Sequence, residues 1–165
     1  MSIHGSERWS NVKASVFAYV MALQISGSPP WVVEGQPRAQ AQEGPWARLG
    51  LRPVDETMAG EWSTTARASR VDFLIVVDLF WPDGSTAQVV NTYALDKAAD
   101  DLIHSLRYAD IPMKDYAADA ENPSTLTGHA IRLMELPIRS ERQAAEGFHR
   151  VQILADAYHH IQHAS

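Results

Sequence analysis

The chain has 165 residues, of which 45% are hydrophobic. This length fits one domain with a substantial core and is too short for two comfortable domains, so we treat residues 1–165 as one domain. The formal net charge of −6 gives no reason to expect a nucleic-acid-binding surface, which normally needs clustered Lys and Arg. There is no cysteine, which excludes disulfides, thiolate nucleophiles and zinc-ribbon sites.

The sequence also bears on the compartment in which the protein works. The first ten residues, MSIHGSERWS, contain no basic segment followed by an apolar run, so they do not resemble a secretory signal. The longest apolar stretch, Phe73 to Val77, is far shorter than the roughly 20 residues that a membrane helix needs. We therefore expect a soluble protein that has no membrane partner and is made inside the cell.

The first elements expected along the chain are a helix and two extended segments. Between residues 7 and 26 the apolar side chains recur at intervals of three and four, the spacing of an amphipathic helix. The prolines in SGSPP break that helix, and WVVEGQP then predicts a short extended piece. Residues 45–54 alternate partially and predict a strand.

A polar segment follows at residues 55–69, and it predicts a long exposed loop. Trp62 lies within this loop and not in a periodic segment, close to Arg67 and Arg70. An exposed tryptophan beside arginines is typical of an anchor in a protein interface. The alternative is that Trp62 tucks under its own loop.

Residues 70–81, RVDFLIVVDLFW, give the strongest strand signal of the chain. Both faces of this strand are partly apolar, which favours a central position in a sheet. Asp72 and Asp78 share one face, and a carboxylate inside an apolar run is costly to bury unless it is paired or hydrated. We expect both to point to solvent at a partly exposed face; the alternative is that they face a neighbouring subunit or an aqueous channel.

The rest of the chain predicts one more helix and two more strands. The helix begins at Ser85 or Thr86 and runs to about residue 108, followed by an irregular insertion at 109–128. Strands are expected at 129–138 and 148–158, joined by the connection SERQAAEG. The predicted fold class is α/β (α+β), with a mixed, largely antiparallel sheet of four to five strands flanked by two main helices.

The sequence lacks the short motifs that are typical of catalytic, metal-binding and cofactor-binding sites. The sequence has no GxSxG, no GxxxxGK[ST] and no GxGxxG, and the histidines near its end, His149, His159, His160 and His163, lack the intervening Glu of HExxH. Because chain ends are usually mobile, we expect the last three to form a solvated polar tail and not a metal site. No catalytic residue, metal or cofactor is predicted, and the protein is not expected to be an enzyme.

The central part of the chain carries three short motifs that point to a known family. They lie in PWARLGLRPV, in RVDFLIVVDLFWPDG and in the following helix that contains AADDLI. The matching residues are Pro45, Trp46 and Arg48, then Arg70, Val77, Phe80, Pro82 and Gly84, then Ala99, Asp100 and Ile103. On these motifs the chain resembles the tail-terminator (tail-completion) proteins of long-tailed phages, the lambda minor tail protein U-like family.

That resemblance implies a virion structural protein of the tail or neck, present in the host cytoplasm during assembly. Six copies form a ring that caps the tail tube, ends tube polymerisation and joins the tail to the head. The implied partners are the tail-tube protein on one face and a head-completion or connector protein on the other. Genome DNA passes through the bore without sequence-specific binding, and an acidic ring fits that passage because it repels phosphates.

The resemblance also suggests roles for the residues singled out above. The loop 55–69 is the expected tail-tube contact, through Trp62, Arg67 and Arg70, whereas Asp72 and Asp78 are expected at a subunit contact or the bore. The insertion 109–128 and the histidine-rich end depart from the shorter family members.

Two other functions stay open at this point. The first is a head-completion or neck protein, or another tail-completion ring. The second is a small enzyme or ligand-binding domain with a pocket near His104, His129 or Asp78, which predicts a monomer or dimer with a concave pocket.

Overall fold

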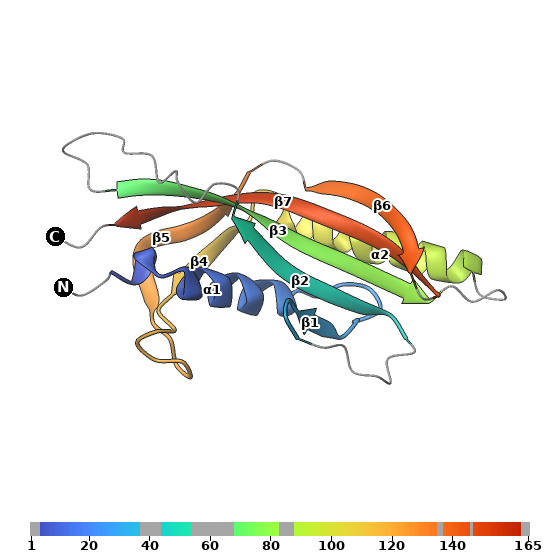
Figure 1. Ribbon diagram of the computed structural model, residues 1–165, viewed down its shortest axis with the longest axis horizontal. Coiled ribbons are helices and arrows are strands. Elements are labelled where there is room, and N and C mark those ends of the chain that lie inside the picture. The colour runs from blue at the N-terminus through green and yellow to red at the C-terminus, as the bar shows by residue number, and fades with distance from the viewer. Residues whose placement is uncertain are drawn as a thin grey trace.

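Two strands of 15 residues, β3 (Ala68–Pro82) and β7 (Phe148–Gln162), pair antiparallel along their whole length and form the centre of the sheet (Figure 1). The computed structural model describes residues 4–36, 44–53, 68–82, 88–134, 137–145 and 147–162. The sheet formed by these residues also contains β1 (Trp31–Val33), β2 (Trp46–Pro53), β4 (Asp110–Lys114), β5 (Thr125–Leu133) and β6 (Ile138–Ala145).

The strand order is β1-β2-β3-β7-β5-β4, and β6 shares the outer edge of β7 with β5. Arg132 of β5 pairs with Tyr158 near the end of β7, whereas Ile138 of β6 pairs with Leu154 in its middle. All of these described pairings are antiparallel except that of β1 with β2. The sheet is therefore mixed and largely antiparallel, and it curls because two successive strands divide one edge of β7.

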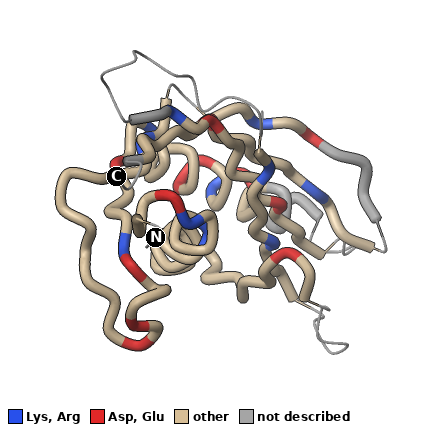
Figure 2. The backbone as a smooth tube through the Cα atoms, turned by 60° about the vertical axis from the view of Figure 1, so that its left-hand side comes forward, with Lys and Arg blue, Asp and Glu red and all other residues tan. Residues whose placement is uncertain are grey.

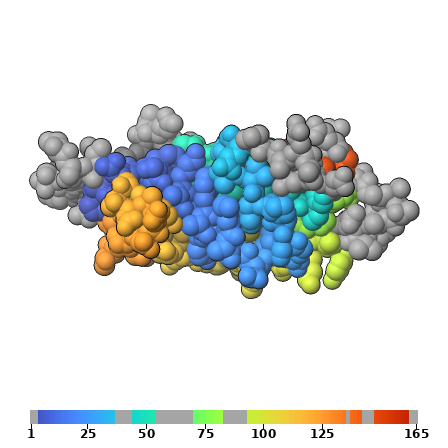
Figure 3. All heavy atoms as spheres, turned by 90° about the horizontal axis from the view of Figure 1, so that it is seen from below, coloured from blue at the N-terminus to red at the C-terminus, as the bar shows by residue number. Residues whose placement is uncertain are grey.

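Both main helices, α1 (Trp9–Met21) and α2 (Gln88–Leu106), lie on the same face of the sheet. A short 3-10 turn, η1 (Gly5–Glu7), precedes α1. Figure 3 shows part of this face, with α1 in blue packed beside the β4–β5 connection in orange. Neither helix, among the described residues, is long and apolar enough to span a membrane.

The core lies between the helices and one face of the sheet. The two-residue period of β3 turns Phe73, Ile75, Val77 and Leu79 toward the helices, and all four are at most 1% exposed. The helices contribute Val12, Val16 and Val20 from α1 and Leu95, Leu102 and Leu106 from α2. Because both helices cover one face, neither of them covers the opposite face of β2, β3 and β7.

The predicted fold class is confirmed, and the sheet has seven strands where four to five were expected. The helix expected at 7–26 is α1, and the helix expected to end near residue 108 is α2. The extended pieces expected at 31–37, 45–54 and 70–81 are β1, β2 and β3.

The prediction of an irregular insertion at 109–128 is wrong, because this stretch contains β4 and the first residues of β5. Ile111 and Met113 of β4 are fully buried, whereas Pro112 between them is exposed. Proline is tolerated here because β4 is the last strand of the sheet order. The sequence contains a short alternation of apolar and other residues here, but Pro112 favours an irregular segment over a strand.

The segment SERQAAEG, predicted as a connection, forms most of β6 and pairs with β7. Its charged residue Glu141 is compatible with a strand because this side chain is 82% exposed and forms an ion pair with Arg139 of the same strand. The strand expected at 148–158 extends to Gln162 and includes His159 and His160.

Candidate functional site

The face of the sheet opposite the two helices is built from alternate residues of β2, β3 and β7. Cross-strand pairing places Trp46 beside Phe80, Arg48 beside Asp78, and Asp78 beside Gln152. Side chains of one parity in paired strands lie on the same face. Aromatic, arginine and carboxylate side chains therefore meet on this face, which we call the open face.

An aromatic cluster lies at one end of the open face. The rings of Trp46 and Phe80 stack with 4.0 Å between their centroids and an angle of 4° between their planes. Val32 and Phe148 complete the cluster, and all four residues are at most 7% exposed. The guanidinium of Arg48 lies 5.2 Å from the Trp46 ring centroid, a cation–π arrangement that holds the arginine over the cluster.

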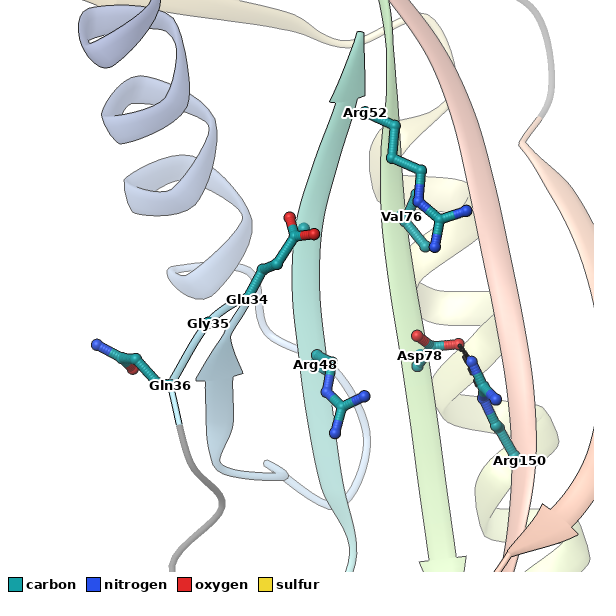
Figure 4. Close-up of a pocket in the computed structure, with 9 residues that line it drawn as sticks. Glu34, Gly35, Gln36, Arg48, Arg52, Val76, Asp78 and Arg150 are labelled. Atoms are coloured by element: carbon teal, nitrogen blue, oxygen red, sulfur yellow. Dashed lines mark hydrogen bonds and ion pairs between the residues drawn. The ribbon is translucent and has the colours of Figure 1, made fainter. Parts of the chain in front are cut away.

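Asp78 is buried beside this cluster and tied to two residues of β7. Its Oδ1 accepts hydrogen bonds from Nε and Nη2 of Arg150, at 3.1 and 2.9 Å (Figure 4). The same oxygen also accepts from Nε2 of Gln152, at 3.1 Å. The residue is 5% exposed, so the prediction that Asp78 points to solvent is wrong. A buried carboxylate is tolerated because a cation and an amide donate to it.

A pocket of about 230 Å³ opens above Asp78. Figure 4 shows side chains from β2, β3, β7 and the segment after β1 around it. The residues that line the pocket are Glu34, Gly35, Gln36, Arg48, Gly50, Arg52, Val76, Asp78 and Arg150.

Gly50 lets Glu34 lie against β2. Glu34 Oε2 accepts a hydrogen bond from the Leu51 amide at 3.3 Å, and a Cβ at position 50 would stand 2.7 Å from that same oxygen. The absence of a side chain therefore admits a carboxylate at the pocket wall.

The charges of the lining favour an anion. The lining contains three arginines and two carboxylates, and Arg150 is already paired with Asp78. Arg48 and Arg52 are exposed, and neither forms an ion pair with a carboxylate in the described part of the chain. Guanidinium groups stay protonated, so they bind anions well and serve poorly as bases. The arrangement is suited to binding a carboxylate-bearing group.

Of the contact residues predicted from the sequence, Trp62 and Arg67 lie outside the described residues, as do residues 55–67 of the loop predicted at 55–69. Residues 68 and 69 belong to β3. Arg70 is described, and it bonds within the same chain. Its Nη2 lies 2.9 Å from Asp72 Oδ1, and its guanidinium stacks 4.1 Å from the centroid of the Tyr158 ring. The side chain of Asp72 is 41% exposed, as expected, and Arg70 and Asp72 do not line the pocket above Asp78.

His159 does not belong to the solvated tail that was expected near the chain end. His159 lies in β7, is 2% exposed and contacts the ring of Phe73 at 6.0 Å between centroids. Burial, together with the positive charges of His160 and His129, lowers the pKa of His159 to about 4. His160 lies in the same strand, and His163 is outside the described residues.

The residues proposed for an enzymatic pocket are not brought together. Asp78 lies in the pocket of the open face, His104 is exposed on α2, and His129 lines a separate hollow with His160 and Arg132. Within the described residues, no group of three His, Cys, Asp or Glu side chains is arranged to hold a metal ion.

Sequence reasoning missed Arg52, Arg150 and Gln152 as parts of one site. The available signal was parity: Arg48 and Arg52 alternate with the buried residues of β2, and Arg150 and Gln152 alternate with the buried residues of β7. Only the register of the three strands shows that Arg48, Arg52 and Arg150 line one pocket and that Gln152 bonds to the carboxylate of Asp78 there.

No family model and no curated protein matches this chain. Eight solved chains do match. One of them, a protein whose name states no function, is 15% identical, with a TM-score of 0.56 over 96% of this chain and 98% of its own. At this identity the likeness shows a shared fold alone.

Proposed function

We propose that this chain is a subunit of a tail-terminator-like ring, a structural protein of the phage tail or neck that acts through its interfaces and not through catalysis. The observation that carries the proposal is the open face of β2, β3 and β7. On this face the exposed arginines Arg48 and Arg52 line a pocket beside a buried aromatic cluster. Arginine is enriched where proteins bind one another.

The positions of the resembling motifs support the proposal. Trp46 and Phe80 belong to two different motifs and are 34 residues apart in the sequence, and their rings stack on the open face. Arg48, from the same motif as Trp46, lies over both rings. Motif residues that meet in space form a physical unit, which is a stronger reason to carry over the family's function than scattered matches.

On this proposal six copies form a ring whose opposite faces bind the tail-tube protein and a head-completion or connector protein, and DNA passes through the bore. The pocket supports binding in place of catalysis, since its cations are arginines and its buried carboxylate already accepts three hydrogen bonds. A head-completion or neck ring is the alternative, because the same open face would serve it equally well.

The test combines mass measurement with electron microscopy. The purified chain is examined by multi-angle light scattering, alone and after mixing with purified tail tubes, and the tube ends are imaged. We expect a six-subunit mass, alone or at tube ends, and tubes that stop growing once capped. A monomer that ignores tubes would contradict the proposal, and a ring that binds connector but not tube would favour the neck alternative.

A further inference from the structure

The β4–β5 connection, residues 115–124, is a rigid and acidic loop at the far side of the sheet from β1. In Figure 1 it extends downward from β4 and β5, and Figure 2 shows its acidic tip standing away from the rest of the chain. Asp119 and Glu121 are at the tip, and residues 117–122 are all exposed.

The shape of this loop is fixed by its own hydrogen bonds. Asp119 Oδ1 accepts from the amides of Glu121 and Asn122, both at 3.0 Å. Asp115 Oδ1 accepts from Asn11 Nδ2 at 3.1 Å, which fastens the base of the loop to α1. Side chains of Asp that bond to amides two or three residues ahead stabilise tight turns. The acidic tip is therefore preorganised, and little conformational entropy is lost when it binds.

The arginine pocket and the acidic loop belong to opposite sides of the sheet. The pocket is formed by β2, β3, β7 and the segment after β1, whereas the loop leaves β4, the last strand at the other edge. No residue of the loop lines the pocket. The loop therefore does not occupy the pocket of its own chain. A contact between two different patches of successive copies repeats head to tail, and it forms a ring where the rotation between copies closes.

We infer that the acidic tip of one subunit docks in the arginine pocket of the next, an inference that rests on the proposed ring. The carboxylates of Asp119 and Glu121 would accept hydrogen bonds from Arg48 and Arg52, two pocket arginines that have no carboxylate partner in the described chain. Charge-assisted bonds between guanidinium and carboxylate are among the stronger polar contacts.

The overall negative charge of the chain favours a contact between the positive pocket and the negative loop tip. Each copy carries a formal net charge of −6, so copies repel one another except where surfaces of opposite sign meet. The pocket is positive on balance and the tip is negative, which makes them complementary.

Three double variants test the contact. The loop variant Asp119→Asn/Glu121→Gln removes two charges while Asn keeps the turn acceptor, and the pocket variant Arg48→Gln/Arg52→Gln removes the two exposed cations. The control Lys97→Gln/Arg107→Gln removes two exposed cations, one from the middle of α2 and one from the residue that follows this helix. We expect the loop and pocket variants to weaken ring formation at least about tenfold, with the control unchanged. Circular dichroism and thermal melts check that all three fold.

Mixing the two defective variants gives a sharper result. The intact loop of the pocket variant fits the intact pocket of the loop variant, but every other contact in the mixture is broken. We therefore expect each variant alone to be monomeric and the mixture to stop at dimers, as measured by light scattering. A mixture that stays monomeric, or rings in either variant that match the unmodified protein, would overturn the inference.

The outcomes separate this inference from the proposed function. Rings or tube caps that form normally in both variants leave the proposed function standing and remove the loop-in-pocket contact. An unmodified chain that forms no ring, alone or on tube ends, contradicts both. Loss of rings in the two variants but not in the control, with dimers in the mixture, supports both.

Discussion

Replacing the buried His159 should make the protein markedly less sensitive to acid. His159 is 2% exposed in β7, its Nδ1 has no hydrogen-bond partner, and its pKa is lowered from 6.5 to about 4. The largest cause is burial, and the positive charges of His160 and His129 add to it, while a hydrogen bond with the Ser6 backbone and the charge of Asp72 oppose it. The folded protein therefore holds this imidazole neutral, and protonation would leave a charged donor buried.

The direction of the pH effect follows from which state binds the proton more tightly. Above pH 6.5 the imidazole is neutral in the folded and unfolded chains, and it adds no pH dependence. Between pH 6.5 and about 4 the unfolded chain takes up the proton first, so the free energy of unfolding falls as the pH falls. At about 1.4 kcal/mol per pH unit, the full loss is about 3 kcal/mol, a large part of the stability of an ordinary domain.

The assay is urea unfolding of the unmodified protein and of His159→Leu at pH values from 8 to 4. Leucine places an apolar side chain at this buried position and removes the group that titrates. Across this range we expect the total fall in the free energy of unfolding to be about 3 kcal/mol smaller in the variant than in the unmodified protein. The matched control is His104→Gln, which removes an exposed histidine of α2 and should keep the acid sensitivity. Equal acid sensitivity in His159→Leu and the unmodified protein would refute the reasoning.

Two ion pairs should respond very differently to the loss of one partner. Asp78→Ala removes the acceptor for Arg150 and Gln152 at a site where the Asp78 side chain is 8% exposed, so we expect a loss of roughly 3 kcal/mol in urea unfolding. Arg139→Ala breaks a pair with Asp96 whose side chains are 26% and 46% exposed, so we expect a loss below about 1 kcal/mol. Equal losses in the two variants would contradict the role assigned to burial.

Much of the fold could be predicted from the sequence because it follows from strong local periods. The alternation of Phe73, Ile75, Val77 and Leu79 predicts β3, and the helical spacing of the apolar residues predicts α1 and α2. The parts that were missed, β4 and β6, are short, polar or interrupted by Pro112. Their strand conformation comes from pairing with β5 and β7, which a local pattern does not contain.

The candidate site was harder to predict because it is assembled from several strands. The sequence showed that Asp78 is a carboxylate in an apolar run, but not that Arg150 and Gln152 lie across from it. Burial near His159 was missed for the same reason, since β7 extends further toward the chain end than its apolar pattern. Strand register is a long-range property, and it decides which polar residues meet.

The residues around the pocket are difficult to explain by the needs of the fold alone. Gly50 lies inside a strand, where glycine is unfavourable, and it admits the carboxylate of Glu34. Asp78 and Arg150 form a partly buried pair, although apolar residues of similar volume often give equal or greater stability. Arg48 covers an aromatic stack that an apolar neighbour could have covered.

These residues lie together at one place on a face that neither helix covers. Their common location is the physical reason to search for the binding function there, and the pairing of variants Arg48→Gln/Arg52→Gln with Asp119→Asn/Glu121→Gln addresses that location directly.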